Sequence, residues 1–493
     1  MNALLLYPEF PDGFWSFKYA LKFIGRKAAL PPLGLLTVAA MLPKDWNLRL
    51  VDTNVNKLAE SDLLWADYAF LGAMVVQRRS AKDLIARCNA ANVPVIAGGP
   101  LFTEESDQFP MVDHLVLGEA EEIFPRFLAD FETGCAERIY KAPGYSDIQI
   151  APVPRWDLLD MRQYASMSVQ SSRGCPYDCD FCDITVLFGR RPRVKTPQQI
   201  IGELDALWEA GWRNNVFFVD DNFVGNKPYL KKALLPALVT WQRSHKRPVS
   251  FYTEVSINLA DDEELMRQMV AAGFNKVFVG IETAEEEGLH ECNKLHNTRR
   301  DLMENVRRLQ NVGLEVQGGF IVGFDHDTAS TFGRQRDFIQ GSGIVTAMVG
   351  MLQAPPGTKL YERLRAEGRI NGIISGDNVD GTTNINPRMS PEILSSGYQW
   401  LVRYLYTPRH YYQRIRTFLR EYRPRPSRAS FDPQYFLALV RSFFYLGVFG
   451  KERYHYWKLV VWMLFRHPRF FPLGIKHAIL GYHLRKVYEL NLN

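Results

Sequence analysis

The chain contains the run Arg173-Gly174-Cys175-Pro176-Tyr177-Asp178-Cys179-Asp180-Phe181-Cys182, from which its fold and chemistry can be approached. Three cysteines fall within eight positions, in a C-x3-C-x2-C spacing. Three thiolates can hold three irons of a four-iron cluster, which leaves the fourth iron able to bind another molecule. A closed structural metal site would need four protein ligands. The spacing therefore predicts an iron–sulfur cluster with one open iron, held by Cys175, Cys179 and Cys182.

The run has two alternative interpretations: a zinc site completed by a distant ligand, or three unreactive cysteines. The chain has no second C-x2-C pair, and no histidine lies within 50 residues on either side of the run. The other cysteines, Cys88, Cys135 and Cys292, are scattered singly. Scattered single cysteines do not form a disulfide framework, so we expect a reducing compartment.

The cysteine spacing, with Phe181 directly before the last cysteine, resembles the radical S-adenosylmethionine (SAM) superfamily. The resemblance implies that the amino and carboxylate groups of SAM bind the open iron. One electron, from a donor of the flavodoxin or ferredoxin type, then cleaves SAM to a 5′-deoxyadenosyl radical. The protein would position and shield this cofactor chemistry.

Residues 1–150 alternate short apolar runs with helical patterns, which predicts a doubly wound parallel sheet, a Rossmann-like domain. Such sheets bind ligands at the carboxyl ends of their strands. The segment lacks G-x-G-x-x-G and G-x4-G-K-[ST] motifs, so nucleotide binding is not favoured. The expected strands are 2–7, 48–52, 68–75, 93–97 and 114–117, and the expected helices are 33–42, 80–91 and 119–131.

Three pieces of this segment resemble the cobalamin-binding domain that precedes the barrel in one large radical SAM subclass: Pro31–Leu35, Gly98-Gly99-Pro100 and Gly118–Glu121. The glycines also fit a role in turns alone. No D-x-H-x2-G element is present, so cobalt would have no histidine below it, and we expect His114 to be structural. The implied cobalamin contacts are Leu33, Gly34, Met74, Val75, Val76, Gln77, Gly98, Gly99, Pro100, Gly118 and Glu119.

After a linker at 151–165, residues 166–385 repeat a strand–helix pattern six times, which predicts a partial (β/α)6 TIM-like barrel. The cluster run directly follows the first of these strands, at the carboxyl end where barrel active sites lie. The expected strands are 166–172, 215–219, 249–255, 276–281, 314–322 and 344–352. Thr196-Pro197-Gln198-Gln199 has capping-box spacing and predicts a helix that ends near Gly211, and a second helix is expected over 261–273.

Several strand ends of the expected barrel resemble the SAM-binding motifs of the superfamily. An acidic strand end suits SAM's amino group because carboxylates accept hydrogen bonds, although a solvated acidic turn is the alternative. Phe181 is implied near the adenine, Glu282 at the ribose and the glycine-rich fifth strand beside the adenine. The implied SAM contacts are Phe181, Asp220, Asp221, Glu254, Ser256, Glu282, Gly319 and Ile321.

Finer features resemble the branch that contains hopanoid C-2 methylases and bacteriochlorophyll side-chain methylases. They are Tyr7–Pro11 with Phe14-Trp15-Ser16, and Asn378–Asn384 just after the barrel. The resemblance implies that a substrate carbon radical takes a methyl group from methylcobalamin, and that a second SAM remethylates cobalt.

The last region, 386–493, is expected to be mainly helical, with a basic hinge at 421–430. Residues 401–493 hold 17 Lys and Arg against 4 Asp and Glu, a net charge of +13, so residues 1–400 carry 5 − 13 = −8. No apolar run reaches the roughly 20 residues that span a bilayer. Aromatic residues between cations suit a helix in the membrane interface. A helical cap on the barrel and a nucleic-acid surface are the alternatives.

The sequence thus predicts a cobalamin-dependent radical SAM methyltransferase that acts on an unactivated carbon of an apolar lipid, isoprenoid or tetrapyrrole. A radical SAM cyclase or oxidoreductase without methyl transfer is one alternative, and a cobalamin- or redox-responsive binding protein is another. We expect a cytoplasmic protein, peripheral on the inner face of the membrane if the tail binds lipid, with no nucleic-acid partner.

Overall fold

The computed structural model describes residues 1–245, 249–424 and 433–491, and the chain divides into two compact units. Much of the expected hinge at 421–430 lies outside these residues. The first unit comprises Met1–Pro11, Leu30–Pro176 and Ile184–Asp220. The second unit comprises Asp12–Ala29, Tyr177–Asp183 and Asp221–Asn493.

The first unit is built on a six-stranded parallel sheet with the order β2-β1-β3-β4-β5-β6. The inner strand β1 is buried along Ala3–Leu6, because helices cover both faces of the sheet. All five strands predicted here are present, and β6 was missed because it has only three residues. The strands are β1 Asn2–Tyr7, β2 Asn47–Asp52, β3 Tyr68–Gly72, β4 Val95–Gly98, β5 His114–Leu117 and β6 Ile139–Lys141.

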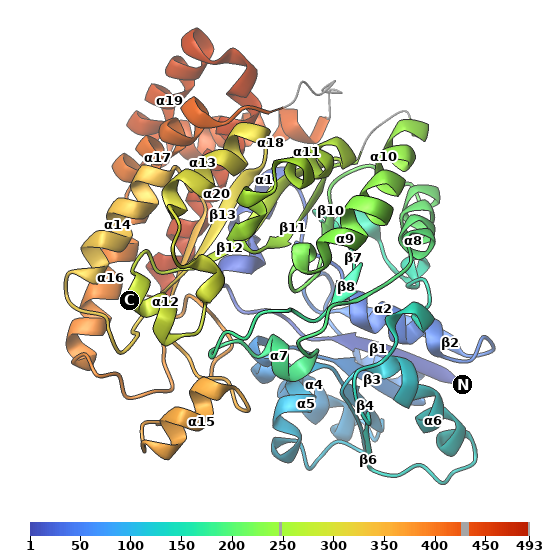
Figure 1. Cartoon of the computed structure of the whole chain (residues 1–493). Coiled ribbons are helices and arrows are strands. Elements are labelled where there is room, and N and C mark those ends of the chain that lie inside the picture. Colours follow the sequence, from blue (N-terminus) through green and yellow to red (C-terminus); the bar gives the residue numbers. More distant parts are fainter. Residues whose placement is uncertain (246–248, 425–432, 492–493) are drawn as a thin grey trace. The chain divides into compact units, whose positions relative to one another are not determined.

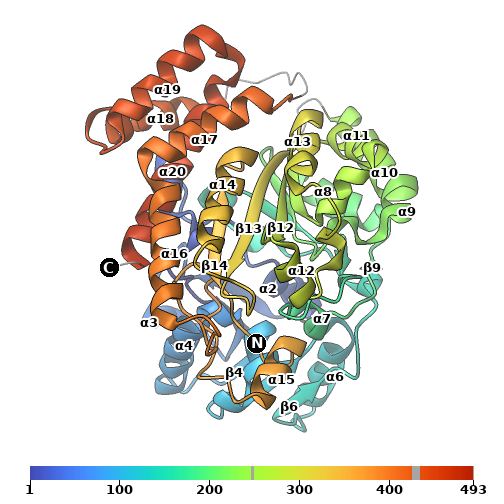
Figure 2. The same cartoon turned by 60° about the vertical axis from the view of Figure 1, so that its left-hand side comes forward.

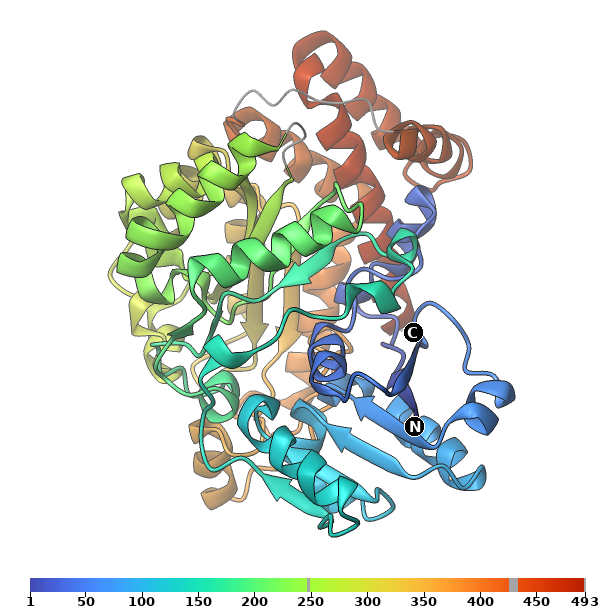
Figure 3. The same ribbon diagram turned by 90° about the vertical axis from the view of Figure 1, so that its right-hand side faces the viewer.

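Helices lie against the sheet of this unit (Figure 3), and two apolar cores, one on each face, hold them to it. On one face, Ile85 of α4 and Phe102 of α5 pack against the strands. On the other face, Leu35 of α2 and Phe127 of α6 do so. Two cores on one sheet confirm the doubly wound fold predicted for residues 1–150. The helices are α2 Leu33–Met41, α3 Glu60–Trp65, α4 Arg78–Ala90, α5 Pro100–Glu105 and α6 Ala120–Glu132.

The first unit also contains the first two strands expected for the barrel. Strands β7 and β10 pair in parallel, with Val216 opposite Met167. Helix α8 begins where the capping box predicts, since the Thr196 hydroxyl accepts a hydrogen bond from the Gln199 N–H. The elements are β7 Met167–Val169, β8 Ser172–Arg173, α7 Ile184–Leu187, β9 Arg193–Val194, α8 Pro197–Glu209 and β10 Val216–Phe218.

The second unit contains the other four barrel strands, paired in parallel in the order β11-β12-β13-β14 (Figure 1). Along β12, Val277, Val279 and Ile281 are fully buried, whereas Phe278 and Gly280 keep exposed surface. The buried face lies under helices and the other face lines the interior. The elements are α9 Lys227–Tyr229, α10 Leu235–Ser244, β11 Phe251–Val255, α11 Glu263–Ala272, β12 Phe274–Glu282, α12 Glu286–Glu291, α13 Leu302–Val312, β13 Glu315–Val322, α14 Thr331–Ser342, β14 Ala347–Met351 and α15 Lys359–Ala366.

A helical region covers the edge strand β14 (Figure 2). The Tyr406 hydroxyl donates to the Ala347 carbonyl, and the Tyr488 hydroxyl bonds both the N–H and the carbonyl of Val349 at 3.4 Å. These tyrosines satisfy edge groups that a partial barrel leaves unpaired. The elements are α16 Pro391–Tyr406, α17 Pro408–Glu421, α18 Pro433–Ser442, α19 Arg453–Arg466 and α20 Phe471–Asn491, which confirms the predicted helical extension.

Residues Asp12–Ala29, which we name the strap, leave the first unit after β1 and fold with the second. The strap contains a short 3-10 turn, Phe14–Ser16, and helix α1, Lys18–Ile24. Helix α1 contacts α18 and α20, and His483 of α20 bonds the Phe14 carbonyl at 3.1 Å. The sequence predicted no such excursion, because nothing in a short aromatic segment between a strand and a helix indicates its packing partner.

Candidate functional site

Part of the cluster run, Tyr177–Asp183, is fixed within the second unit by main-chain contacts. The Asp180 N–H donates to the Cys292 carbonyl at 3.0 Å, and the Asp180 carbonyl accepts from the Leu360 N–H at 2.8 Å. The Asn293 amide donates to the Asp178 carbonyl at 2.8 Å. The loop that carries Cys179 and Cys182 is therefore held from two sides, after β12 and after β14.

Cys175, which belongs to the first unit, follows an obligatory glycine. Gly174 has a φ of +92°, and a Cβ there would lie 3.0 Å from the carbonyl oxygens of Phe188, Gly189 and Arg191. Only glycine adopts this conformation in that space without strain. None of the three run cysteines forms a disulfide. Among the described residues, no group of three or more Cys, His, Asp or Glu could hold a metal ion, so the assignment of the cluster ligands stays a prediction.

A buried ion pair lies at the carboxyl end of β12. Lys294 binds the Glu282 carboxylate, and both side chains are about one-tenth exposed. The negative field of Glu282, with that of Cys179, raises the pKa of Lys294 although burial opposes this. Glu282 has a φ of +64°, which is unusual for a side chain of its size, and such strain is concentrated at functional sites. The sequence predicted Glu282 as a site residue but missed Lys294.

Two of the predicted SAM contacts pack in different surroundings on β13. Ile321 joins Phe181 in an apolar cluster that also includes Cys292 and Phe324. The inner surface of Gly319, in contrast, is covered by the Phe278 ring, since a Cβ there would lie 3.0 Å from that ring. Phe181 and Ile321 are thus brought together, whereas Gly319 gives room to a neighbouring side chain.

Of the acidic residues predicted at the strand ends, Asp220 has a structural role. Asp220 is buried, and its carboxylate accepts hydrogen bonds from the Ser171 N–H at 2.6 Å, the Ser172 N–H at 2.9 Å and the Ser171 hydroxyl. Burial raises the pKa of Asp220 to about 6, although these hydrogen bonds oppose the rise. Asp220 therefore holds the start of the loop that leads to the cysteines.

Glu254, in β11, faces the interior of the second unit and forms no ion pair with the described residues. Burial, followed by the charge of Asp221, raises its pKa to about 7. Nearby, the Ser256 hydroxyl donates to the Asn258 side-chain oxygen at 2.7 Å. Ser256 and Asn222 also bond each other at 3.2 Å through the Ser256 N–H. A carboxyl that is neutral at acidic pH and charged above neutrality suits proton or ammonium binding.

Arg173, the first residue of the cluster run, is tied to the Gly118–Glu121 motif. Its guanidinium lies 2.6 and 2.9 Å from the Glu121 carboxylate oxygens and 3.2 Å from Glu119. Arg193 binds Glu119 at 2.6 and 2.7 Å. The four side chains are at most 18% exposed. Hydrogen bonds and the charge of Arg173 lower the pKa of Glu121 against the effect of burial. The Glu119 side chain, predicted to contact cobalamin, is thus occupied by arginines.

Three of the glycines predicted to contact cobalamin are also required by the local backbone conformation or packing. A Cβ at Gly98 would lie 2.9 Å from the Val116 carbonyl, and Gly99 and Gly118 have φ values of +95° and +88°. Gly34, at the start of α2, has nothing within 4 Å and is open to a ligand. Met74 is 49% exposed in the loop after β3. An open glycine and an exposed apolar side chain at this edge fit a large organic cofactor.

Two further residues of this domain have internal roles. Gln77 is buried and donates to the Pro8 carbonyl at 2.6 Å, while accepting from the Met74 N–H at 2.9 Å. The His114 ring bonds the Glu137 carbonyl at 2.7 Å and packs against Phe127, as expected for a structural histidine. The cobalamin contacts as a set stay predictions.

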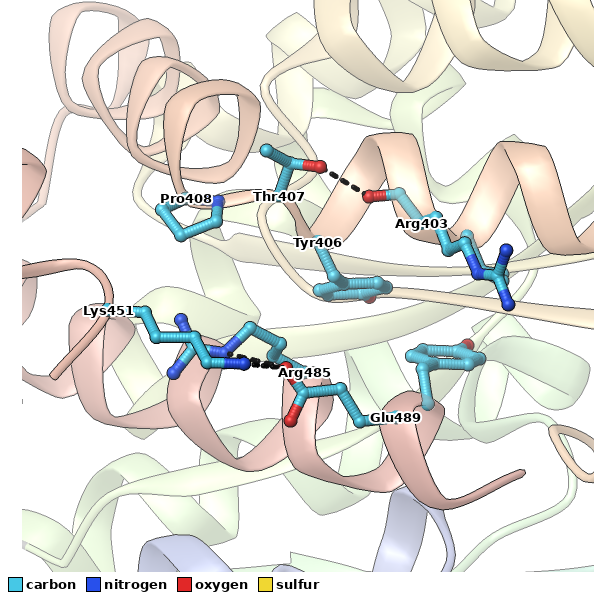
Figure 4. A pocket seen from close by; sticks show the side chains of 9 residues that line it. Arg403, Tyr406, Thr407, Pro408, Lys451, Arg485 and Glu489 are labelled. Atoms are coloured by element: carbon cyan, nitrogen blue, oxygen red, sulfur yellow. Dashed lines mark hydrogen bonds and ion pairs between the residues drawn. The ribbon is translucent and has the colours of Figure 1, made fainter. Parts of the chain in front are cut away.

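A cavity of about 280 Å³ lies among the C-terminal helices, away from the motifs above (Figure 4). The Tyr406 and Tyr488 rings, whose hydroxyls bond β14, form part of its wall. Arg485 and Lys451 share the Glu489 carboxylate at 3.7 and 3.8 Å. None of the predicted site residues lines this cavity.

Comparison with known proteins identifies the family. Residues 169–339 match the Radical SAM superfamily, and residues 358–492 match a domain of unknown function, DUF4070. The chain is 41% identical over 497 residues to an uncharacterized methyltransferase of Synechocystis, covering 99% of this chain and 92% of that protein. It is 34% identical over 481 residues to the hopanoid C-2 methylase of Rhodopseudomonas palustris, covering 94% and 90%. This chain belongs to the radical SAM methyltransferase family.

A solved structure supports the fold of this methyltransferase. The cobalamin-dependent SAM radical enzyme OxsB, in its aqua-cobalamin form, matches with a TM-score of 0.63 at 14% identity, covering 99% of this chain and 80% of that one. At this identity the likeness shows the fold alone. The predicted α/β architecture, with a Rossmann-like domain, a partial barrel and a helical extension, is confirmed, as is the resemblance to the radical SAM superfamily.

Proposed function

We propose that this methyltransferase places a methyl group on an unactivated carbon of a polycyclic isoprenoid lipid of the hopanoid type, with cobalamin as the methyl carrier. The observation that carries the proposal is the 34% identity to the hopanoid C-2 methylase across nearly the full length of both chains. Phe278 and Gly319, on the inner faces of β12 and β13, support an apolar substrate.

The cofactors of the proposal are a four-iron cluster, SAM and cobalamin. When bound, they supply an adenosyl radical and a transferable methyl group. Cys175, Cys179 and Cys182 hold the cluster, since thiolates are the ligands that such clusters use. A flavodoxin or ferredoxin is the proposed electron donor.

The residues proposed to bind SAM act from the carboxyl ends of the strands. Glu282, fixed by Lys294, and Glu254 present carboxyl groups, while Asp220 orients the loop before the cysteines. Phe181 and Ile321 provide apolar surface. The other proposed contacts are Asp221, Ser256 and Gly319.

The domain at 1–150 is proposed to hold cobalamin at the carboxyl edge of its sheet, ahead of a linker at 151–165, a barrel at 166–385 and the extension at 386–493. Gly34 leaves open space there, and Met74 offers an apolar contact. The other proposed contacts are Leu33, Val75, Val76, Gln77, Gly98, Gly99, Pro100, Gly118 and the main chain of Glu119.

The test uses anaerobically reconstituted protein, SAM with a labelled methyl group and a hopane-type pentacyclic hydrocarbon in detergent micelles. We expect labelled, mass-shifted hydrocarbon, S-adenosylhomocysteine and 5′-deoxyadenosine, all absent in Cys182→Ala. If 5′-deoxyadenosine forms but the label never enters a lipid, a cyclase or oxidoreductase activity replaces the methyl transfer proposed here. Retained SAM cleavage in Cys182→Ala would contradict the ligand assignment.

We also propose that the C-terminal helices bind an anionic membrane surface, at the inner face of the cell membrane. Helices α18 and α19, with the π-helical turn Phe443–Val448 and residues up to Gly450 between them, expose a row of apolar side chains, which we name the aromatic patch. Two of its residues, Phe449 and Phe465, are 79% and 83% exposed. The patch comprises Tyr435, Phe436, Leu437, Val440, Phe443, Phe444, Tyr445, Val448, Phe449, Tyr454, Trp457, Val461, Leu464 and Phe465.

Exposed cations lie in the same segment as the aromatic patch. Glu452, an acidic residue of this segment, is buried and pairs with Arg485 at 2.7 Å. Lys451 pairs with Glu489 at 3.8 Å, and the exposed cations without an ion pair among the described residues are Arg453, Lys458, Arg466 and Arg469. Apolar surface beside unopposed cations fits an anionic lipid surface better than water. No helix of the described residues is long and apolar enough to cross a bilayer.

Vesicle sedimentation tests this surface. We expect binding to vesicles with 30 mol% phosphatidylglycerol, weaker binding to pure phosphatidylcholine, and at least a tenfold loss with Phe449→Ser/Phe465→Ser, since each phenyl group removed from lipid is worth about 1.5–3 kcal/mol. Exposed Ile373→Ser, outside the patch at 61% exposure, is the matched control. Equal recovery of all three proteins would exclude the patch as the contact.

A further inference from the structure

Trp15 occupies a position inside the second unit that neither the proposed cofactors nor the membrane contact uses. Its indole lies against the Phe278 ring, with centroids 5.2 Å apart. Phe278 is on the inner face of β12, and its ring covers Gly319 on β13. The Met348 methyl group would lie 3.7 Å from a Cβ at Gly319, so it borders the same surface from β14. Three strands and the strap thus contribute to one apolar floor.

Neighbouring residues of the strap fix the position of Trp15. Phe14 is buried, packs edge-on against Trp15 at 5.0 Å and has its carbonyl bonded by His483. Phe17, next in the turn, has a φ of +48°, an uncommon conformation for a bulky residue. Trp15 itself remains 39% exposed. Because Trp15 packs on Phe14 and Phe278 and still has an exposed surface, its ring can contact a ligand with little loss of side-chain conformational entropy.

The distance from the floor to the carboxyl ends of the strands is suited to a polycyclic substrate. Phe278 and Glu282 are four residues apart on β12, which corresponds to about 13 Å along a strand. Between them the inner face has no side chain at Gly280, over which the Lys294 ammonium and the Glu282 carboxylate lie. The inner face of β12 therefore changes from aromatic at Phe278 to charged at Gly280, towards the end where SAM is proposed to bind.

We propose that Trp15, Phe278 and Met348 form the floor on which the ring system of the substrate lies, so that Trp15 of the strap is a specificity-determining residue. The inference rests on the proposed function for the class of substrate. Flat, rigid hydrocarbon matches this floor because the aromatic faces and the thioether offer apolar contact, while the Asn378 amide, 3.9 Å from the Met348 sulfur, already has that sulfur as its acceptor.

The floor is tested by binding, measured apart from turnover. Reconstituted protein is equilibrated with a radiolabelled hopane-type hydrocarbon in detergent micelles, and the retained label gives Kd. We expect Trp15→Ala to raise Kd at least tenfold, Phe278→Leu about threefold and Trp15→Phe less than threefold. Trp400→Ala is the matched control, because Trp400 is similarly exposed at 44% but packs on Tyr404 of α16.

The outcomes separate this inference from the function on which it rests. If wild-type protein binds the hydrocarbon and Trp15→Ala binds it equally well, the floor is wrong and the proposed function stands. If wild-type protein binds no polycyclic hydrocarbon, the substrate class fails and the floor fails with it. Trp15→Phe keeps an aromatic ring, so retained binding in this variant would show that the change at Trp15 does not act through misfolding alone. Vesicle binding should be the same in every variant.

Discussion

Replacing Arg173 by methionine should destabilise the first unit by about 3 kcal/mol at pH 8. Breaking a buried ion pair by removing one partner costs about 3–5 kcal/mol. The lower value applies because Glu119 keeps Arg193, at 2.6 and 2.7 Å, and only Glu121 loses its arginine. With an m-value of about 2 kcal/mol/M in urea, the unfolding midpoint should fall by about 1.5 M.

The pH dependence of this loss has a definite sign. In the wild type the pKa of Glu121 is lowered, so its contribution to stability is present above its unfolded pKa and lost as pH falls. Without Arg173, burial is the largest remaining cause, opposed by a backbone hydrogen bond and the charge of Lys195, and we expect the pKa of Glu121 to rise above that of the unfolded chain. The variant then loses stability as pH rises, so the difference from wild type should be larger at pH 8 than at pH 5.

The assay is urea unfolding of cluster-free, reduced protein, followed by hydrogen exchange of peptides from β3 and β4. Arg155→Met is the control in the same unit, because Arg155 and Asp157 are 40% and 60% exposed and such pairs contribute about 1 kcal/mol at most. The double variant Arg173→Met/Glu121→Gln should recover part of the loss. A single variant within 1 kcal/mol of wild type at pH 8 would refute the role given to this network.

Three further predictions concern single side chains. Gly174→Ala should bring φ strain and contacts of 3.0 Å with three carbonyls, so we expect less than half of the wild-type iron content, whereas Gly134→Ala, with a φ of +71° but no atom within 4 Å, should keep it. Glu254→Gln should remove the fall in unfolding free energy that the wild type shows as pH rises from about 4.5 to about 7. In this range the carboxyl ionises in the unfolded chain but stays protonated in the folded protein, so an unchanged slope would contradict the pKa of about 7. Tyr488→Phe should lower the melting temperature by removing about 1 kcal/mol of hydrogen bonding from Val349, and Tyr482→Phe, whose hydroxyl forms no hydrogen bond with the described residues, should be neutral.

Sequence periodicity predicted strands β1 to β5, β7 and β10 to β14 and helices α2, α4, α6, α8 and α11, because these segments show short apolar runs or apolar residues at helical spacing. In α11, Leu265, Met266 and Met269 are buried, whereas Val270, predicted on the same buried face, is half-buried, and Thr196 caps α8. The elements that were missed, such as α3 and β6, are too short to show a period. Local pattern does not encode which distant segment an element will pack against, so the strap was not foreseen.

The candidate site was predictable where chemistry demands a residue type in a fixed spacing. The cysteines and Glu282 belong to such motifs, and Glu282 is indeed paired and buried. Lys294 and Arg193 carry no local signal, because a single cation in a loop looks the same whether it is solvated or pairs with a buried carboxylate. For Glu119 the motif was recognised, but the arginines that occupy its side chain lie 54 and 74 residues away.

The path of the chain has a consequence for how this enzyme can be made and altered. The backbone passes from one unit to the other five times, after Pro11, Ala29, Pro176, Asp183 and Asp220. Strand β1, at the very start, lies between β2 and β3, so a fragment that begins at Leu30 would lack an inner strand of its sheet. No single cut therefore releases an intact half. The two units cannot be exchanged between relatives as separate cassettes, and during synthesis neither can finish folding until residues from far along the chain have emerged.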